Sequence, residues 1–135
     1  MERSSAFDLR LKGLGKQERK AVFTHFISTF EQGGFEGLNT YTLNGYPVRN
    51  KSSDNVDTDH PNFSTLVKYA QKHKLWHFHI GFYDYNYEIK GYEVSPKNDL
   101  TSQWVVHYQL HGDSHINAID ITPHPPFDLP PEDKF

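Results

Sequence analysis

Two histidines in a strand-like stretch offer the most obvious chemistry in this sequence. His77 and His79 lie in the aromatic segment KLWHFHIGFY, whose alternation is typical of a β-strand. Residues two apart in a strand share a face, so both imidazoles project together, opposite Trp76, Phe78 and Ile80. We expect the bulky apolar face to meet helices and the histidines to face solvent or a ligand. The pair predicts proton transfer or metal binding, unless it simply covers a sheet surface.

His107 is the nearest candidate for a third imidazole. It falls in the predicted strand 101–110 and would join His77 and His79 if the two strands were neighbours. Three imidazoles suit either a metal or acid–base chemistry. No acidic residue lies at a spacing diagnostic of a metal site, and we predict neither a metal nor a cofactor. Which of these histidines joins the pair stays open: His60, His107, His111 or His115.

Cleavage of RNA by its own 2′-hydroxyl needs the groups that such a cluster supplies. A base removes the hydroxyl proton, an acid protonates the leaving oxygen, and a cation stabilises the phosphate. The reaction requires no thiol, and the chain contains no cysteine, so disulfides, thiolate zinc sites and a cysteine nucleophile are excluded. The phosphate-binding loop, the serine nucleophile elbow and the HExxH zinc motif are also absent from the sequence.

Composition indicates one globular domain. The chain has 135 residues, and ten Phe, eight Tyr and two Trp compensate for an apolar fraction of only 36%. The net charge is −3, so any nucleic-acid contact must rest on a local basic patch. No apolar run is long enough to span a membrane and no signal-peptide pattern is present, so we expect a cytoplasmic protein.

The periodicity predicts helices followed by strands. The first element, 6–11, alternates weakly and is expected to be a short strand. Apolar spacing predicts helices over 16–32 and 59–75, with His25 on the exposed side of the first and a long loop over 35–58. Strands are expected at 75–83, 86–95, 101–110 and 115–122, with a hairpin at 111–114.

This order predicts an α+β fold, a small antiparallel sheet with two helices packed on one face. We expect a single domain over 1–126 and an extended, acidic, proline-rich tail over 127–135. Proline cannot continue a helix or a central strand, so the tail should lie over the domain rather than extend the sheet.

Four segments in order resemble a known family. They are FTHFISTFEQGG, the strand HFHIG, the segment SPKNDLTSQWVVHYQ and the Pro-His-Pro that follows the closing strand. In this order they are similar to the YafO-type toxins of bacterial type II toxin–antitoxin systems, a divergent branch of the RelE/ParE superfamily. The resemblance covers roughly residues 6–126. The family continues into a basic helix where this chain has its acidic tail.

The resemblance implies a RelE/ParE-like fold and a ribosome-dependent endoribonuclease, an mRNA interferase that inhibits translation. It implies a cognate antitoxin, messenger RNA and the ribosome as partners. The residues expected to be catalytic are His77, His79, His107 and Asp99, although Asp99 could instead cap a turn. The residues expected to bind RNA are Arg49, Lys51, Lys90, Lys97 and Asn98.

Two alternatives stay open beside this interpretation. The chain could be a non-catalytic binding or regulatory module with the same fold. It could also be a metal-dependent small-molecule enzyme that uses His77 and His79. Cleavage specificity, the identity of the antitoxin and the oligomeric state do not follow from the sequence.

Overall fold

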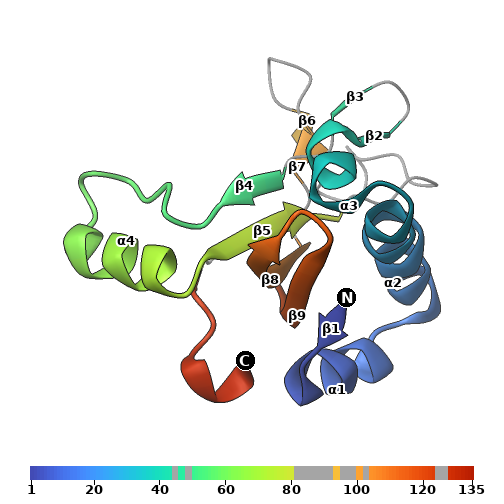
Figure 1. The fold of residues 1–135 in the computed structure, drawn as a ribbon, viewed down its shortest axis with the longest axis horizontal. Coiled ribbons are helices and arrows are strands. Elements are labelled where there is room, and N and C mark those ends of the chain that lie inside the picture. Colours follow the sequence, from blue (N-terminus) through green and yellow to red (C-terminus); the bar gives the residue numbers. More distant parts are fainter. Residues whose placement is uncertain (44–45, 48–49, 81–92, 95–99, 102–103, 124–127) are drawn as a thin grey trace.

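The computed structural model describes residues 1–43, 46–47, 50–80, 93–94, 100–101, 104–123 and 128–135. Its helices and strands form an α+β fold, which confirms the predicted class (Figure 1). In chain order the elements are β1 (Glu2–Arg3), α1 (Ser5–Gly13), α2 (Lys16–Ala21), the π-helix η1 (Val22–Ile27), α3 (Ser28–Thr40), β2 (Thr42–Leu43), β3 (Tyr46–Pro47), β4 (Asn50–Ser52), α4 (Phe63–Lys72), β5 (Leu75–His79), β6 (Glu93–Val94), β7 (Leu100–Thr101), β8 (Trp104–Gly112), β9 (His115–Pro123) and the 3₁₀-helix η2 (Glu132–Lys134).

The main sheet has five strands in the order β1-β9-β8-β5-β4. Strands β4, β5, β8 and β9 pair antiparallel, and β8 and β9 form the predicted hairpin. The expectation of a purely antiparallel sheet is wrong, because β1 pairs with β9 in parallel. The sheet is therefore mixed, and its longest strands lie at its centre.

The N-terminal helices cover one face of this sheet. Phe26 of η1 packs against Phe78 of β5 and Tyr108 of β8, with ring centroids 5.5 and 5.6 Å apart. All three side chains are fully buried, and they belong to one cluster that also contains residues from α1 and α3. This is the predicted apolar face of β5, and its burial supplies most of the hydrophobic stabilisation of the fold.

The segment 6–11 is helical, so the strand predicted there is wrong. Ser4 caps α1, and its hydroxyl accepts a hydrogen bond from the backbone N–H of Phe7 at 3.1 Å. Phe7 and Leu11, four residues apart, share one side of the helix, and both are buried. The capping residue and this spacing favour a helix over the weak alternation that suggested a strand.

The helix predicted over 16–32 is present, but a π-helical turn changes which residues it buries. In η1 the N–H of Ser28 bonds to the carbonyl of Phe23, the i→i+5 pattern of a π-helix. The wider turn rotates Phe23 outward, where it is 45% exposed, and turns His25 inward. The expectation that His25 lies at the surface is wrong: its Nδ1 lies 2.8 Å from the carbonyl oxygen of Ile80.

The helical region extends into the segment that was expected to be a loop. Helix α3 runs to Thr40, and β4 adds a strand at 50–52. Gly34 interrupts the helix with a φ of 64°, which lets the N–H of Phe35 bond to the carbonyl of Asp113 at 2.8 Å. A Cβ atom at Gly34 would lie 2.6 Å from that carbonyl oxygen, so this close approach requires glycine.

Helix α4 lies on the opposite side of the sheet from the N-terminal helices (Figure 1). Ala70 of α4 packs with Leu75 and Ile119, and Leu129 and Phe135 of the C-terminal segment join this second cluster. The expectation that both helices share one face is therefore wrong. Apolar spacing predicts a helix here, as the structure has, but it does not specify which side of a sheet the helix covers.

The C-terminal segment 128–135 packs against the domain, as expected, although it ends in η2 rather than staying extended. The hydroxyl of Tyr69 donates to the carbonyl of Pro130 at 2.6 Å, and His73 Nε2 lies 3.0 Å from Glu132 Oε1. Of the helices in the described ranges, none combines the length and the apolar character that a membrane crossing needs.

Candidate functional site

A row of four polar residues crosses the sheet on the face opposite the N-terminal helices. The strand register pairs Lys51 with His77, His77 with His107, and His107 with Asp120. Residues that pair directly across strands project from the same face. A cation, two imidazoles and a carboxylate thus stand side by side on β4, β5, β8 and β9. We call these four residues the cross-strand row.

The three histidines highlighted by the sequence lie close together. The ring centroids of His77 and His79 are 5.3 Å apart, and those of His77 and His107 are 6.4 Å apart. The structure therefore brings His107 to the pair because β5 and β8 are neighbours, the condition on which that expectation rested.

All three imidazoles are buried, so the expectation that they face an open surface is wrong. His77, His79 and His107 are 5%, 3% and 1% exposed. Their side of the sheet also carries the second apolar cluster, which α4 and the C-terminal segment build around Leu75 and Ile119. Alternation predicted correctly which residues share this face. It could not predict that the face would also be covered.

Hydroxyl groups hold two of the rings. Ser53 Oγ lies 3.0 Å from His77 Nδ1, and Thr122 Oγ1 lies 2.7 Å from His107 Nε2. A hydroxyl can donate to an unprotonated ring nitrogen or accept from a protonated one. These partners therefore orient each ring, and each contact is compatible with either tautomer of the imidazole.

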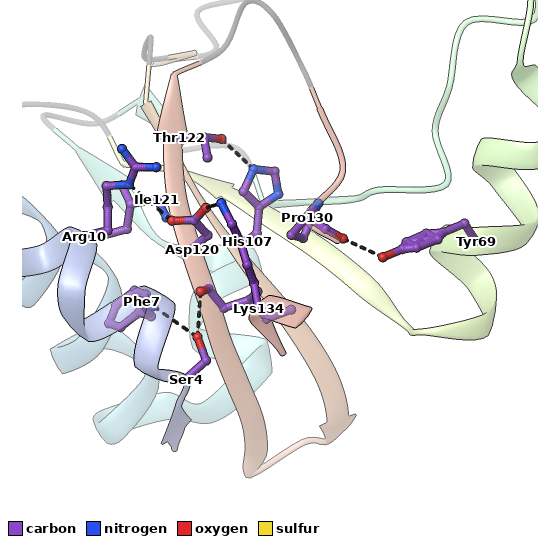
Figure 2. A network of polar contacts seen from close by, with 11 residues as sticks. Ser4, Phe7, Arg10, Tyr69, His107, Asp120, Ile121, Thr122, Pro130 and Lys134 are labelled. Atoms are coloured by element: carbon purple, nitrogen blue, oxygen red, sulfur yellow. Dashed lines mark hydrogen bonds and ion pairs between the residues drawn. The ribbon is translucent and has the colours of Figure 1, made fainter. Parts of the chain in front are cut away.

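Asp120, which sequence analysis did not single out, ends the row as a buried carboxylate. Its side chain is 2% exposed, and Figure 2 shows the groups that compensate its charge. Lys134 Nζ lies 2.8 Å from Oδ2, Arg10 Nε lies 3.4 Å from Oδ1, and the N–H of Ile121 donates to Oδ1 at 2.8 Å. Two cations and a backbone amide therefore compensate the charge of this buried carboxylate.

A signal for Asp120 was present in the predicted hairpin. Gly112 pairs with His115 across the two-residue turn. Counting back from that pair at a constant register places His107 opposite Asp120, and the structure has the same pairing because the two register shifts that lie between these pairs cancel. The hairpin register, rather than a sequence motif, was the information that could have found the carboxylate.

Five of the residues proposed for RNA contact or catalysis lie outside the described part of the chain. They are Arg49, Lys90, Lys97, Asn98 and Asp99. Most of the strand predicted over 86–95 also lies outside it, and only β6 is described there. Of the predicted RNA-binding residues, Lys51 is the one that the structure places, and it stands next to His77.

The remaining histidines do not join the row. His60 is exposed, and its Nδ1 accepts a hydrogen bond from the N–H of Asn62 at 3.0 Å. His111 and His115 are exposed at the hairpin end of the sheet, where His115 Nε2 lies 3.1 Å from Glu2 Oε2. Of the histidines left open by the sequence, His107 is the one that lies beside His77.

The described residues contain no group of three histidine or acidic side chains arranged to hold a metal ion. The three imidazoles lie close together, but their nitrogens do not converge in that way. The metal-dependent alternative therefore lacks a ligand set within the ranges that the structure describes.

The cross-strand row combines a primary amine, two imidazoles oriented by hydroxyl groups and a compensated carboxylate. This combination can take up a proton, deliver a proton and stabilise an anion without a metal or a thiol. Comparison of the chain with protein-family models, with curated proteins and with solved structures finds no match.

Proposed function

We propose that this chain is the toxin of a bacterial type II toxin–antitoxin system, a metal-independent endoribonuclease that cleaves messenger RNA on the ribosome. The observation that carries the proposal is the cross-strand row, in which Lys51, His77 and His107 are neighbours on one face. The order of the four sequence segments similar to YafO-type toxins supports it. The α+β class agrees with the RelE/ParE-like fold implied by that similarity, although α4 covers the opposite face.

In the proposed reaction, one imidazole removes the proton of a ribose 2′-hydroxyl. The resulting oxygen attacks the adjacent phosphorus, and the bond from phosphorus to the 5′-oxygen breaks. The second imidazole gives its proton to that 5′-oxygen, so the products are a 2′,3′-cyclic phosphate and a 5′-hydroxyl. His77 and His107 fill these two roles, and Lys51 stabilises the charge on the phosphate.

Burial of the rings fits an enzyme that acts only in complex with its partner. His77 and His107 are at most 5% exposed, so a phosphate cannot reach them in this conformation. We propose that contact with the ribosome opens the face that carries the row and admits the messenger RNA. A cognate antitoxin would hold the same protein in its closed state.

The test is cleavage by purified protein with and without ribosomes, with 5′ ends mapped on the messenger RNA. His77→Asn and His107→Gln should each lower cleavage by at least about 100-fold, since general acid–base groups contribute about 10²–10⁴-fold. These changes keep an amide near Nδ1 of His77 and Nε2 of His107, where Ser53 and Thr122 bond. Each variant therefore loses proton transfer but retains a hydrogen-bonding partner.

His111→Gln is the matched control, because His111 lies on the same strand as His107 but is exposed and outside the row. It should cleave at the parent rate. Growth arrest on expression, relieved by a small neighbouring gene product, would support the toxin assignment. Full cleavage by the His77→Asn, His107→Gln double variant, with its fold verified by circular dichroism, would reject the catalytic roles.

A second function is favoured by the burial of the imidazoles. Rings this enclosed and bonded to hydroxyls also suit a non-catalytic binding module, in which they only stabilise the sheet. That function predicts association with a partner but no RNA cleavage, with or without ribosomes. The His77→Asn variant would then change thermal stability and leave binding unaltered.

A further inference from the structure

A cavity lies beside the end of the cross-strand row, between α1, β9 and η2. Its volume is about 440 Å³, and Asp120 forms part of its wall. Asp120 is also the register partner of His107, so one residue of the cavity wall is the cross-strand neighbour of a proposed catalytic group. Its size is within the range of small-molecule sites in proteins.

One part of the cavity wall is apolar and aromatic. Leu9, Leu14 and Trp104 line it, and Leu9 is 75% exposed although it is a large apolar residue. A partly exposed indole beside exposed leucine suits a flat ligand, because every nucleobase can stack on an aromatic ring. A small inorganic anion would make no use of this surface.

The other part of the wall is cationic. The side chains of Arg10 and Lys134 are 44% and 36% exposed and approach the cavity from α1 and η2. Their described contacts with Asp120 use one of five guanidinium N–H groups and one of three ammonium protons. Two cations against one carboxylate leave a net positive charge that favours an anionic group.

We propose that this cavity binds one nucleotide unit of single-stranded RNA. The base stacks against Trp104 and the leucines, and the phosphate lies between Arg10 and Lys134. The inference rests on the proposed function and deepens it, because a unit held here would position the neighbouring phosphodiester towards His107. A nucleoside 5′-monophosphate carries the same chemistry and serves as the minimal probe.

Trp104 provides a direct signal for binding. The chain has two tryptophans, so the Trp76→Phe variant leaves Trp104 as the sole reporter. We expect adenosine 5′-monophosphate and a six-nucleotide single-stranded RNA each to change the fluorescence of this variant with saturation. The oligonucleotide should bind more tightly because it adds phosphate contacts. Inorganic phosphate should give no comparable change.

Gly13 gives a way to fill the cavity without disturbing the fold. It lines the cavity, and a Cβ atom there would meet nothing within 4 Å. Gly13→Leu should weaken nucleotide binding at least tenfold. Gly33→Leu is the matched control, because a Cβ at Gly33 also meets nothing within 4 Å and Gly33 lies outside this cavity. Arg10→Gln should weaken binding and lower its salt dependence.

The outcomes separate the two proposals. Nucleotide binding that Gly13→Leu weakens and Gly33→Leu preserves supports the site, even if no RNA is cleaved and the catalytic proposal fails. Unchanged binding in Gly13→Leu, an equal response to inorganic phosphate, or no response to either nucleotide probe would overturn the site, even if ribosome-dependent cleavage is found.

Discussion

The two faces of the central sheet are built from alternate residues of the same strands, yet different interactions stabilise them. On the face covered by the N-terminal helices, Phe26, Phe78 and Tyr108 pack ring against ring. On the other face, His77 and His107 are as deeply buried but are oriented by hydroxyl groups. Equal burial therefore does not mean an equal role. The first face stabilises the fold, and the second places groups able to move protons.

Truncation of the apolar face should have the largest effect on stability. We expect Phe78→Ala to lower the free energy of unfolding by about 3–5 kcal/mol, because it leaves a cavity among well-packed rings. Phe78→Leu keeps much of the volume and should cost less than about 1.5 kcal/mol. Urea unfolding measures both values. A loss below about 1 kcal/mol in the alanine variant would mean that this face is not the main core.

Disruption of the close contact between α3 and the β8–β9 hairpin should have the second-largest effect on stability. Gly34→Ala introduces a Cβ atom against the carbonyl of Asp113 and penalises a positive φ, so we expect a loss of about 2–3 kcal/mol. Gly33→Ala has no such contact and should be neutral or slightly stabilising. If the two variants unfold at the same urea concentration, α3 does not rest on the hairpin as described.

Substitution of Asp120 tests how much a buried, charge-compensated carboxylate contributes to stability. Asp120→Asn removes the charge that holds Lys134 and Arg10, and we expect a loss of about 2 kcal/mol, as for hydrogen bonds to charged groups. Asp8 forms an exposed ion pair with Arg3 at 3.2 Å, so Asp8→Asn should cost less than about 1 kcal/mol. Thermal unfolding compares the two, and equal losses would mean that burial of the carboxylate is unimportant.

The faces should also differ in their response to alkaline pH. Burial raises the pKa of Tyr108 well above its usual value of 10.0. The folded state then retains a proton that the unfolded chain loses, so stability is complete below pH 10 and falls as the pH rises further. In Tyr108→Phe this decline should be shallower. Measurement of the free energy of unfolding between pH 8 and 11 tests it.

Tyr69, on the other side of the sheet, is the comparison for that experiment. Desolvation, and then the charges of Glu132 and Asp133, raise the pKa of Tyr69 as well, but this side chain is less buried. Tyr69→Phe should therefore flatten the alkaline decline less than Tyr108→Phe does. The opposite ranking would show that the C-terminal segment encloses Tyr69 more tightly than the structure indicates.

The smallest effect should come from the exposed pair between His73 and Glu132. Their nitrogen–oxygen distance is 3.0 Å, but Glu132 is 65% exposed, and solvent screens such pairs. We expect Glu132→Gln to lower the free energy of unfolding by less than about 1 kcal/mol in urea. A larger loss would mean that this contact, rather than the apolar packing of Leu129 and Phe135, holds the C-terminal segment.

The sequence predicted those features that depend on local alternation. It identified both faces of β5 and the hairpin between β8 and β9, and it placed His107 beside His77 on the condition that their strands are neighbours, which the structure meets. These predictions hold because successive side chains in a strand point in opposite directions. The α+β class also followed from apolar spacing, which is helical in the earlier part of the chain and alternates as in strands in the later part.

The features that the sequence did not predict depend on irregular backbone or on distant contacts. The π-helical turn buries His25, whereas regular helical spacing places that residue on the exposed side. The position of α4 depends on Ile119 and Phe135, which lie far along the chain. The compensation of Asp120 requires Arg10 and Lys134 from opposite ends of the sequence. Apolar periodicity shows which residues share a face of one helix or strand. It does not show which distant elements pack together, so these contacts could not be predicted from it.

Ser4 links the two ends of the chain through one hydroxyl. It accepts from Phe7 to begin α1 and donates to the carbonyl of Ile119 at 2.7 Å, while the N–H of Ser4 bonds to Ala118. The contact with Ile119 spans 115 positions of the sequence. During synthesis, β1 and α1 therefore cannot make these contacts until β9 has been made. A nascent chain that lacks β9 has no partner for these first residues, so this part of the fold depends on a contact between segments far apart in the sequence and forms late.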